Sequence, residues 1–310
     1  SASVHLPYGP GEIIADMGMG SGTPTYLQAL LNPETQIIGV DINPEAVNHA
    51  NTLYAWLPNL SFKQGDIEQL IFPPESLSGI LDSSAFHHVY SFNNYDRAHV
   101  RLAIANQVAQ LKENGILVIR DFVEPTEGTV VLELPEMLDG EQNADIAWLM
   151  KFSQTARILA DEKDRGFFIE ELDGVKWGFR QFRIPAKYAA EFVLRKDYTE
   201  HWDTEILEEY TYFSQQEFER VFEENGLRIL FSKPVRNPWI MRNRFQGMFR
   251  VFDESGKELD FFSTNFIIVG QKIPNHSGAR LSEKRVIAPW ATPYLKTSHY
   301  RDKLTGEIWD

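Results

Sequence analysis

Three glycines at alternate positions follow an acidic residue near the N-terminus, in the segment DMGMGSGT. Gly18, Gly20 and Gly22 carry no side chain, so the backbone N–H groups between them can approach a ligand closely. The apolar run IIA precedes Asp16, and a helix-like segment begins after Gly22. A strand that runs through such a loop into a helix is a typical ligand-binding device. Glycines that only turn the chain are the alternative interpretation of the loop.

Two further acids end the next strand-like runs. Asp41 closes QIIGVD, 19 residues after Gly22, where a carboxylate can accept hydrogen bonds from both hydroxyls of a ribose. Asp66 follows in QGDI, where it can meet the amino group of an adenine whose faces rest on Ile42 and Ile67. The three segments together therefore predict a cofactor that contains adenosine.

Two adjacent histidines follow the fourth strand-like segment, SGILDSS. An imidazole can take up a proton near neutral pH, so either His87 or His88 could be a general base beside the cofactor. We favour His87 because it falls five residues after Asp82. The alternative is that one histidine caps a helix or packs under the loop.

A metal site is a second way to use the acids at these strand ends. Asp121 and Glu124 follow the fifth strand-like segment, and with Asp82 they could bind a divalent cation. Other marks of such a site are missing, so we predict no metal. The chain has no cysteine, which excludes disulfides, thiolate zinc ligands and a cysteine nucleophile.

Strand-like and helix-like segments alternate from the start to about residue 122, which predicts a parallel sheet flanked by helices. Thr23 and Asn43 are the predicted N-caps of the first two helices, and each is followed by a proline. Val100, Ile104, Val108 and Leu111 recur at helical spacing, and Gly115 is placed to end their helix.

The alternation resumes after about residue 208. Ser214 and Glu217 predict a capping box, Gly226 ends that helix, and LRILFS and NFIIVGQK are strand-like. Two stretches interrupt the pattern. Residues 124–205 are predicted to be mostly helical, and residues 234–262 to be a loop plus a hairpin that turns at DESG.

The predicted elements divide the chain into four parts. Residues 1–123 form a cofactor-binding core, residues 124–205 a helical insertion or substrate cap, and residues 206–273 the rest of the core with the hairpin. Residues 274–310 are a tail or linker, which ends in KLTGEIWD outside any predicted element. We expect a further domain to follow the tail.

Taken in order, the motifs resemble those of the class I S-adenosylmethionine-dependent methyltransferase family. Residues 16–22 match its first motif, Asp41 its second, GDI at 65–67 its third, GILDSSAFHH its fourth and LKENGILVI its fifth. Dinucleotide folds are the alternative, but Thr23 stands where their third glycine would be. The resemblance is firm over residues 8–122 and loose over residues 208–272.

The resemblance implies a Rossmann-like α/β fold, a seven-stranded doubly wound sheet whose last strand is antiparallel, here with an inserted, mostly helical cap. It also implies S-adenosylmethionine as cofactor, lying over the carboxyl ends of strands one to four. The implied cofactor contacts are Asp16, Gly18, Gly20 and Gly22 at the methionine part, Asp41 at the ribose, Ile42, Asp66 and Ile67 at the adenine, and Asp82 or Ser83 at the methionine amino group.

The fourth motif narrows the methyl acceptor. Enzymes that methylate amino groups of DNA bases or glutamine carry an Asp/Asn-Pro-Pro-aromatic stretch there, whereas this chain has DSSAF. Methylation of cytosine carbon needs a cysteine. The chain thus resembles the small-molecule branch, which methylates oxygen or nitrogen. The alternatives are an RNA, protein or peptide acceptor, a non-catalytic binding module of the same fold, and a nicotinamide-dependent oxidoreductase.

A basic strip in residues 234–250 suggests the charge of the acceptor. It carries Arg236, Arg242, Arg244 and Arg250, interleaved with Trp239, Phe245 and Phe249. We predict that Arg242, Arg244, Trp239 and, from the DYTEHW segment, Trp202 contact an anionic or aromatic acceptor. The alternative is that the arginines pair with carboxylates.

The bulk composition sets limits on partners and location. The net charge is −14, and residues 1–150 hold 19 of the 44 acidic residues but only 5 of the 30 Lys and Arg. An acidic surface repels phosphate backbones, so we do not expect a nucleic-acid partner. The sequence shows no apolar run of roughly 18 residues and no signal peptide, and we expect a cytoplasmic protein without membrane contact.

Overall fold

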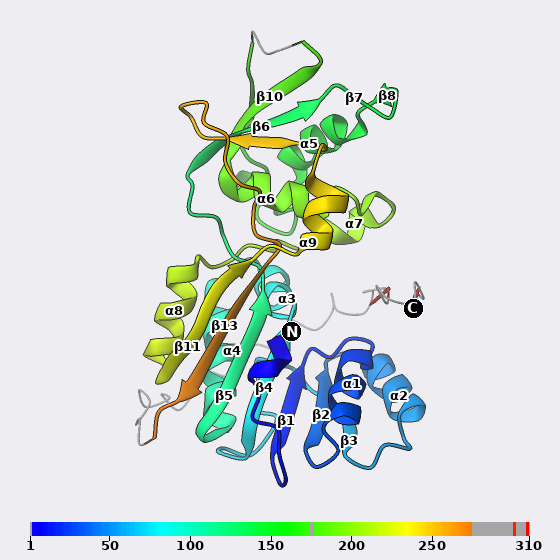
Figure 1. The fold of residues 1–310 in the computed structure, drawn as a ribbon, viewed down its shortest axis with the longest axis vertical. Helices are drawn as coiled ribbons and strands as arrows, with labels where there is room; N and C mark the ends of the chain where they lie inside the picture. Colours follow the sequence, from blue (N-terminus) through cyan, green and yellow to red (C-terminus); the bar gives the residue numbers. More distant parts are fainter. Residues whose placement is uncertain (1, 174–176, 275–299, 302–307, 310) are drawn as a thin grey trace.

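A seven-stranded sheet forms the centre of the lower half of the molecule in Figure 1. The structure is a computed structural model that describes residues 2–173, 177–274, 300–301 and 308–309. The strand order is β11-β13-β5-β4-β1-β2-β3. The strands are β1 (Ile13–Met17), β2 (Gln36–Asp41), β3 (Leu60–Gln64), β4 (Leu77–Ser83), β5 (Leu111–Asp121), β11 (Leu227–Val235) and β13 (Asn265–Lys272).

The pairing confirms the predicted Rossmann-like topology. Strands β1 to β5 pair in parallel, whereas β13 lies antiparallel to both β5 and β11. The last strand is therefore the reversed one. The parallel strands point their carboxyl ends toward the upper half of the molecule (Figure 1).

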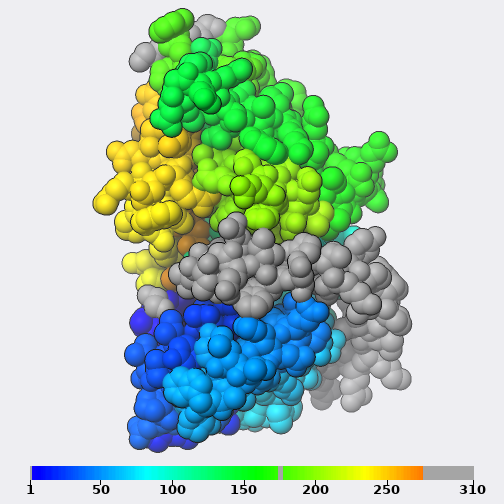
Figure 2. All heavy atoms as spheres, turned by 90° about the vertical axis from the view of Figure 1, so that its right-hand side faces the viewer, coloured from blue at the N-terminus to red at the C-terminus, as the bar shows by residue number. Residues whose placement is uncertain are grey.

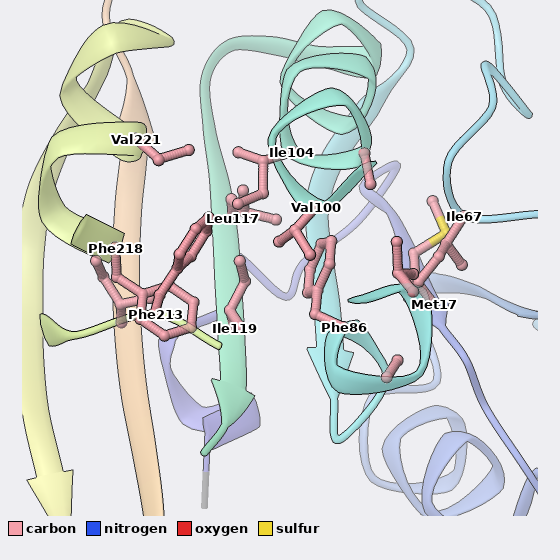
Figure 3. Packing of buried hydrophobic residues seen from close by; sticks show 14 of the residues in the cluster. Met17, Ile67, Phe86, Val100, Ile104, Leu117, Ile119, Phe213, Phe218 and Val221 are labelled. Atoms are coloured by element: carbon pink, nitrogen blue, oxygen red, sulfur yellow. The ribbon is translucent and has the colours of Figure 1, made fainter. Parts of the chain in front are cut away.

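Helices cover both faces of this sheet. They are η1 (Ala2–His5), α1 (Thr23–Leu31), α2 (Pro44–Leu53), α3 (Phe86–Phe92), α4 (Arg97–Gln110) and α8 (Gln215–Glu224). The larger core lies between the sheet and α3, α4 and α8, where Phe86, Ile104 and Phe218 pack against Leu117 and Ile119 (Figure 3). On the other face, Leu6 of the N-terminal segment and Ala29 of α1 pack against Ile14 and Ile37.

A second, smaller unit lies above the carboxyl ends of the strands, and Figure 2 shows it from the side. We call residues 124–205 and 236–262 the cap. Its sheet has the order β12-β6-β10-β9. The cap comprises β6 (Thr129–Pro135), β7 (Met137–Leu138), β8 (Glu141–Gln142), α5 (Ala144–Thr155), η2 (Glu162–Asp164), β9 (Glu170–Glu171), β10 (Phe179–Pro185), α6 (Ala186–Arg195), η3 (Thr199–His201), α7 (Trp202–Glu205), α9 (Pro238–Ile240), η4 (Met241–Phe245) and β12 (Arg250–Phe252).

The prediction of a mostly helical insertion was wrong about this sheet. Strand β6 is buried along most of its length and pairs antiparallel with β10, from Thr129↔Pro185 to Pro135↔Phe179 with the β6 residue given first. A fully buried strand shows no alternation of apolar and polar residues, so its period does not distinguish it from a helix. The hairpin predicted at DESG is confirmed, with the Asp253 N–H bonded to the Lys257 carbonyl, but β12 pairs with β6 and so joins the cap.

The observed helix ends can be compared with the capping residues and helix-ending glycines predicted from the sequence. Asn43 caps α2 through its side chain, Ser214 and Glu217 form the predicted capping box, and Gly226 has φ 73° after α8. Thr23, predicted as an N-cap, is instead the first residue of α1, after Gly22. Helix α4 ends before Gly115, which lies within β5, because β5 already pairs with β4 at Leu111.

Two short strands lie outside both units, β14 (Tyr300–Arg301) and β15 (Ile308–Trp309), and pair with each other. The predicted tail or linker otherwise falls mostly outside the described residues. Within the part of the chain that is described, no helix has the length and apolar character needed to cross a bilayer.

Candidate active site

The glycine loop (residues 18–22) crosses the carboxyl end of β1. Gly18, Gly20 and Gly22 have φ angles of 71°, 57° and 74°, a region that other residues rarely adopt. A Cβ on Gly18 would lie 2.6 Å from the Cβ of Ala85, and one on Gly22 would lie 3.0 Å from that of Ala50. Both the backbone conformation and the packing therefore require glycine.

The carboxylate at the end of β2 holds this loop directly. Asp41 accepts hydrogen bonds from the N–H of Gly20 at 2.9 Å and from the N–H of Asn43 at 2.9 Å. Burial raises the pKa of Asp41, and the backbone hydrogen bonds partly oppose this. The predicted ribose carboxylate thus lies beside the predicted glycine loop, as the resemblance requires.

The residues predicted to contact an adenine surround the ends of β2 and β3. Ile42 is 40 % exposed, whereas Ile67 is buried in the larger core, so of the two only Ile42 presents an open face for an adenine. The side chain of Asp66 accepts a hydrogen bond from the N–H of Glu68 at 2.9 Å and is partly exposed. An exposed isoleucine beside a partly exposed carboxylate suits a planar, apolar ring with a polar edge.

Two of the predicted cofactor residues lie beneath the loop. Asp16 accepts hydrogen bonds from Thr25 at 2.7 Å and Gln28 at 3.2 Å, and burial raises its pKa to about 6. Asp82 is fully buried, accepts a hydrogen bond from Gln107 at 3.0 Å, and has a pKa that burial raises well above its usual value. Of the pair predicted for the methionine amino group, only Ser83 is partly exposed.

The arrangement fits the group that the resemblance implies. Oδ2 of Asp82 has no hydrogen-bond partner among the described residues, and the carboxylates of Asp16, Asp41 and Asp82 gather around the loop. S-adenosylmethionine carries a sulfonium, an ammonium and two ribose hydroxyls. The carboxylate of Asp41 can accept hydrogen bonds from ribose hydroxyls, and the unpartnered Oδ2 of Asp82 can accept one from an ammonium.

The two histidines open α3, and both turn toward one carboxylate. Nδ1 of His87 lies 2.9 Å from Oδ1 of Asp121, and Nε2 lies 3.5 Å from Oε2 of Glu208. Nδ1 of His88 lies 3.3 Å from Oε1 of Glu208. Glu208 belongs to the segment that returns from the cap to the core, so this group joins both units. We call His87, His88 and Glu208 the His–His–Glu cluster.

Asp121 fixes the orientation of His87. It also accepts hydrogen bonds from the N–H of His87 at 3.1 Å, from the N–H of Phe122 at 3.0 Å and from the Tyr212 hydroxyl at 3.1 Å. Burial alone would lower the pKa of His87, but Asp121 and then Glu208 raise it to about 10. Both ring nitrogens therefore face carboxylates, and His87 can act as a base only in its neutral form, which the raised pKa disfavours near neutral pH.

Glu208, in the segment LEEY, was not predicted to be a functional residue. No spacing relates this segment to His87, and nothing distinguishes its two glutamates. The neighbouring Glu209 is also buried, and it contacts Tyr90 of α3 at 2.8 Å and Lys187 of α6 at 2.6 Å. This short segment therefore supplies carboxylates to two polar contacts between the cap and α3.

The acids predicted as a candidate metal group do not converge. Asp121 faces the back of His87, and Asp82 binds Gln107. Glu124 instead pairs with Arg97 at 3.1 Å. Their positions at the ends of two strands do not bring the three carboxylates to a common point.

Residues of the basic strip have different environments. Arg244 donates to Asp197 at 2.5 Å, Arg250 binds Glu133, and Arg236 donates to the Phe261 carbonyl. Arg242 is exposed, and no hydrogen bond or ion pair of its side chain is seen among the described residues. Arg244 and Arg250 therefore pair with carboxylates, which was the alternative interpretation of the basic strip.

The two tryptophans predicted at the acceptor differ in exposure. Trp239 of α9 is 64 % exposed. Trp202 is 2 % exposed, and its ring lies 4.7 Å from that of Trp148 in the apolar core of the cap. A contact between Trp202 and the acceptor is therefore not supported, because the side chain belongs to the cap core.

Comparison with known proteins gives one family and many similar folds. A family model described as a methyltransferase domain matches residues 9–226. No curated protein matches the chain by sequence. A solved structure of an S-adenosylmethionine-dependent methyltransferase from Mesorhizobium loti is 11 % identical, with 87 % of this chain and 95 % of that chain covered and a TM-score of 0.51. One from Methanosarcina mazei is 16 % identical, with 87 % and 97 % covered and a TM-score of 0.48.

Proposed function

Because the chain belongs to the methyltransferase-domain family, whose model spans most of it, we propose that it methylates oxygen or nitrogen of a small acceptor molecule. Its cofactor is S-adenosylmethionine. The observation that carries the proposal is the contact between the glycine loop and the start of α3. Gly18 packs on Ala85 so closely that a Cβ would not fit, and Ala85 is only two residues from His87.

The proposed reaction is an in-line displacement. A lone pair of the acceptor forms a bond to the methyl carbon as the methyl–sulfur bond breaks, and the electron pair of that bond returns to sulfur to leave a neutral thioether. The acceptor's proton must then leave, and His87 is the base proposed for it, acting within the His–His–Glu cluster. The protein's main contribution is to position the acceptor against the methyl group.

The acceptor would lie between the carboxyl edge of the sheet and the cap. Phe122 stacks on Tyr210 with ring centroids 4.7 Å apart, and both rings stand edge-on to His87. On the cap, Trp239 and Arg242 are exposed on α9 and on η4, which follows it. Helix α9 lies at the end of the cap that is closest to the core in Figure 1. These aromatic and cationic groups favour an aromatic or anionic acceptor.

Cofactor binding tests the first half of the proposal. The melting temperature of the protein is expected to rise with S-adenosylmethionine and with its demethylated product but not with nicotinamide dinucleotides, because a ligand that binds only the native state stabilises that state. Asp41→Ala should abolish most of this shift, because the ribose carboxylate is lost. Glu34→Ala, which removes an exposed acid of the same domain, is the matched control.

An unchanged shift in Asp41→Ala would remove this residue from the ribose site, and no shift in the wild type would contradict the cofactor assignment for this chain. Mass spectrometry of small molecules that co-purify with the protein then tests the acceptor. A methylated RNA or peptide in place of a small molecule would overturn the small-acceptor half of the proposal while leaving the cofactor half intact.

A further inference from the structure

The ligand atoms of the His–His–Glu cluster converge on one point. One nitrogen from each histidine and one oxygen of Glu208 all lie within 4.8 Å of one another. Nε2 of His87 lies 3.5 Å from Oε2 of Glu208, and Nδ1 of His88 lies 3.3 Å from Oε1, the other oxygen of the same carboxylate. Metal–ligand bonds of about 2.0–2.1 Å in tetrahedral geometry hold neighbouring ligand atoms about 3.3 Å apart.

Asp121 stands behind His87 in the position of an outer ligand-orienting group. When Nδ1 of neutral His87 donates its hydrogen to Asp121, the lone pair available to a metal is on Nε2, the nitrogen that faces Glu208. Metal-binding histidines almost always donate their second N–H to such a carboxylate or carbonyl. Three further hydrogen bonds to Asp121 keep that carboxylate in place.

The His–His–Glu cluster is covered by protein on one side and accessible to solvent at His88. The side chains of His87 and Glu208 are 5 % and 13 % exposed, whereas that of His88 is 44 % exposed. Three protein ligands with one accessible side are typical of a catalytic site, in which the fourth position binds water or substrate.

We propose that the His–His–Glu cluster binds a divalent transition-metal cation, such as Zn²⁺, through Nε2 of His87, Nδ1 of His88 and a carboxylate oxygen of Glu208. The sequence predicted no metal, and the acids weighed for one, Asp82, Asp121 and Glu124, did not include Glu208. The role of the cation rests on the proposed function. Beside the glycine loop, a bound cation would act as a Lewis acid on a hydroxyl of the acceptor and ease the loss of its proton. In the metal-bound enzyme, His87 would then serve as a ligand of the cation and not as the base that takes the proton.

The site is tested by metal binding in the absence of cofactor. Metal-stripped full chain is titrated with Co²⁺ and followed by visible absorption, and zinc content is measured after equilibrium dialysis. We expect about one equivalent per chain, and we expect His88→Ala and Glu208→Gln to weaken binding about 100-fold or more. Asp121→Asn, which keeps the ligands but alters the carboxylate behind His87, should weaken it about 10- to 100-fold.

His99→Ala is the matched control. His99 lies 2.7 Å from Glu68 in a His–Glu pair outside the cluster, so its loss should leave metal binding unchanged. Because the His88 side chain is only partly buried, His88→Ala should fold, which circular dichroism and a thermal melt will verify. An unfolded Glu208→Gln or Asp121→Asn would leave His88→Ala as the deciding variant.

Two results would overturn the proposal. One is a wild type that retains no zinc, which would leave His87 as the centre of an ion pair with Asp121 and Glu208. The other is metal uptake that His88→Ala does not weaken. Failure of the proposed function looks different, since a chain that binds zinc but not S-adenosylmethionine would keep the metal site and lose the methyltransferase assignment.

Discussion

At the scale of single residues, His87 combines a local position with a distant partner. Its position soon after the fourth parallel strand could be predicted from the fourth motif. The distant part is Glu208, which folding brings to 3.5 Å from Nε2 of His87. No periodicity links two segments so far apart in the chain, so the candidate site could be predicted only on the side of the core.

His87→Ala should lower turnover by about two to four orders of magnitude while leaving the affinity for S-adenosylmethionine unchanged, because the side chain promotes loss of the acceptor's proton, as base or as metal ligand, and does not contact the cofactor. Single-turnover rates and cofactor titration measure the two effects separately. A loss confined to His88→Ala would reassign the role to His88. Little loss in either variant would indicate catalysis by positioning alone.

At the scale of elements, local signals predicted the core well and the cap poorly. Asn43, Ser214 and Gly226 act at helix ends within a few residues of their partners, and the strands of the core follow glycine or proline punctuation. The cap sheet instead depends on pairs such as Thr129↔Pro185 and Val251↔Leu132, between segments far apart in the chain. Such pairing cannot be read from periodicity when both faces of a strand are buried.

Asp16 connects two elements of the core, β1 and α1, through Thr25 and Gln28. Burial raises its pKa from 3.8 to about 6. The folded state therefore favours the protonated form, and this stabilisation is present below about pH 4 and is lost as the pH rises through about 6. A shift of about two pKa units corresponds to about 3 kcal/mol in the free energy of unfolding.

Asp16→Asn should consequently remove much of the fall in unfolding free energy between pH 4 and pH 7, because an amide does not ionise. Chemical denaturation of both proteins without cofactor, at several pH values, measures the difference between their profiles. Asp41 and Asp82 titrate in both proteins, so they cancel in that difference to first order. Parallel profiles would show that Asp16 has an ordinary pKa in the folded protein.

At the scale of the whole molecule, the cap carries the basic strip and also part of the acidic excess of the first 150 residues, such as Glu133, which pairs with Arg250. Most of these arginines are engaged, since Arg236, Arg244 and Arg250 each have a partner within the cap. Arg244 would have to leave Asp197 and the Leu194 carbonyl to reach an acceptor. The exposed Arg242, next to the exposed Trp239, is therefore the better candidate for an anion contact.

Arg242→Ala should raise the Michaelis constant of an anionic acceptor about tenfold or more with little change in kcat, because the lost ion pair contributes to binding and not to the transition state alone. The effect should shrink at high salt, since the contact is exposed and therefore screened. Arg236→Ala is the matched control, because Arg236 is bonded to the Phe261 carbonyl. The measurement uses the acceptor found by co-purification, at two salt concentrations. If the Michaelis constant stays flat in Arg242→Ala and salt leaves it unchanged, the acceptor is not recognised by its negative charge, and recognition must come from the aromatic groups around His87.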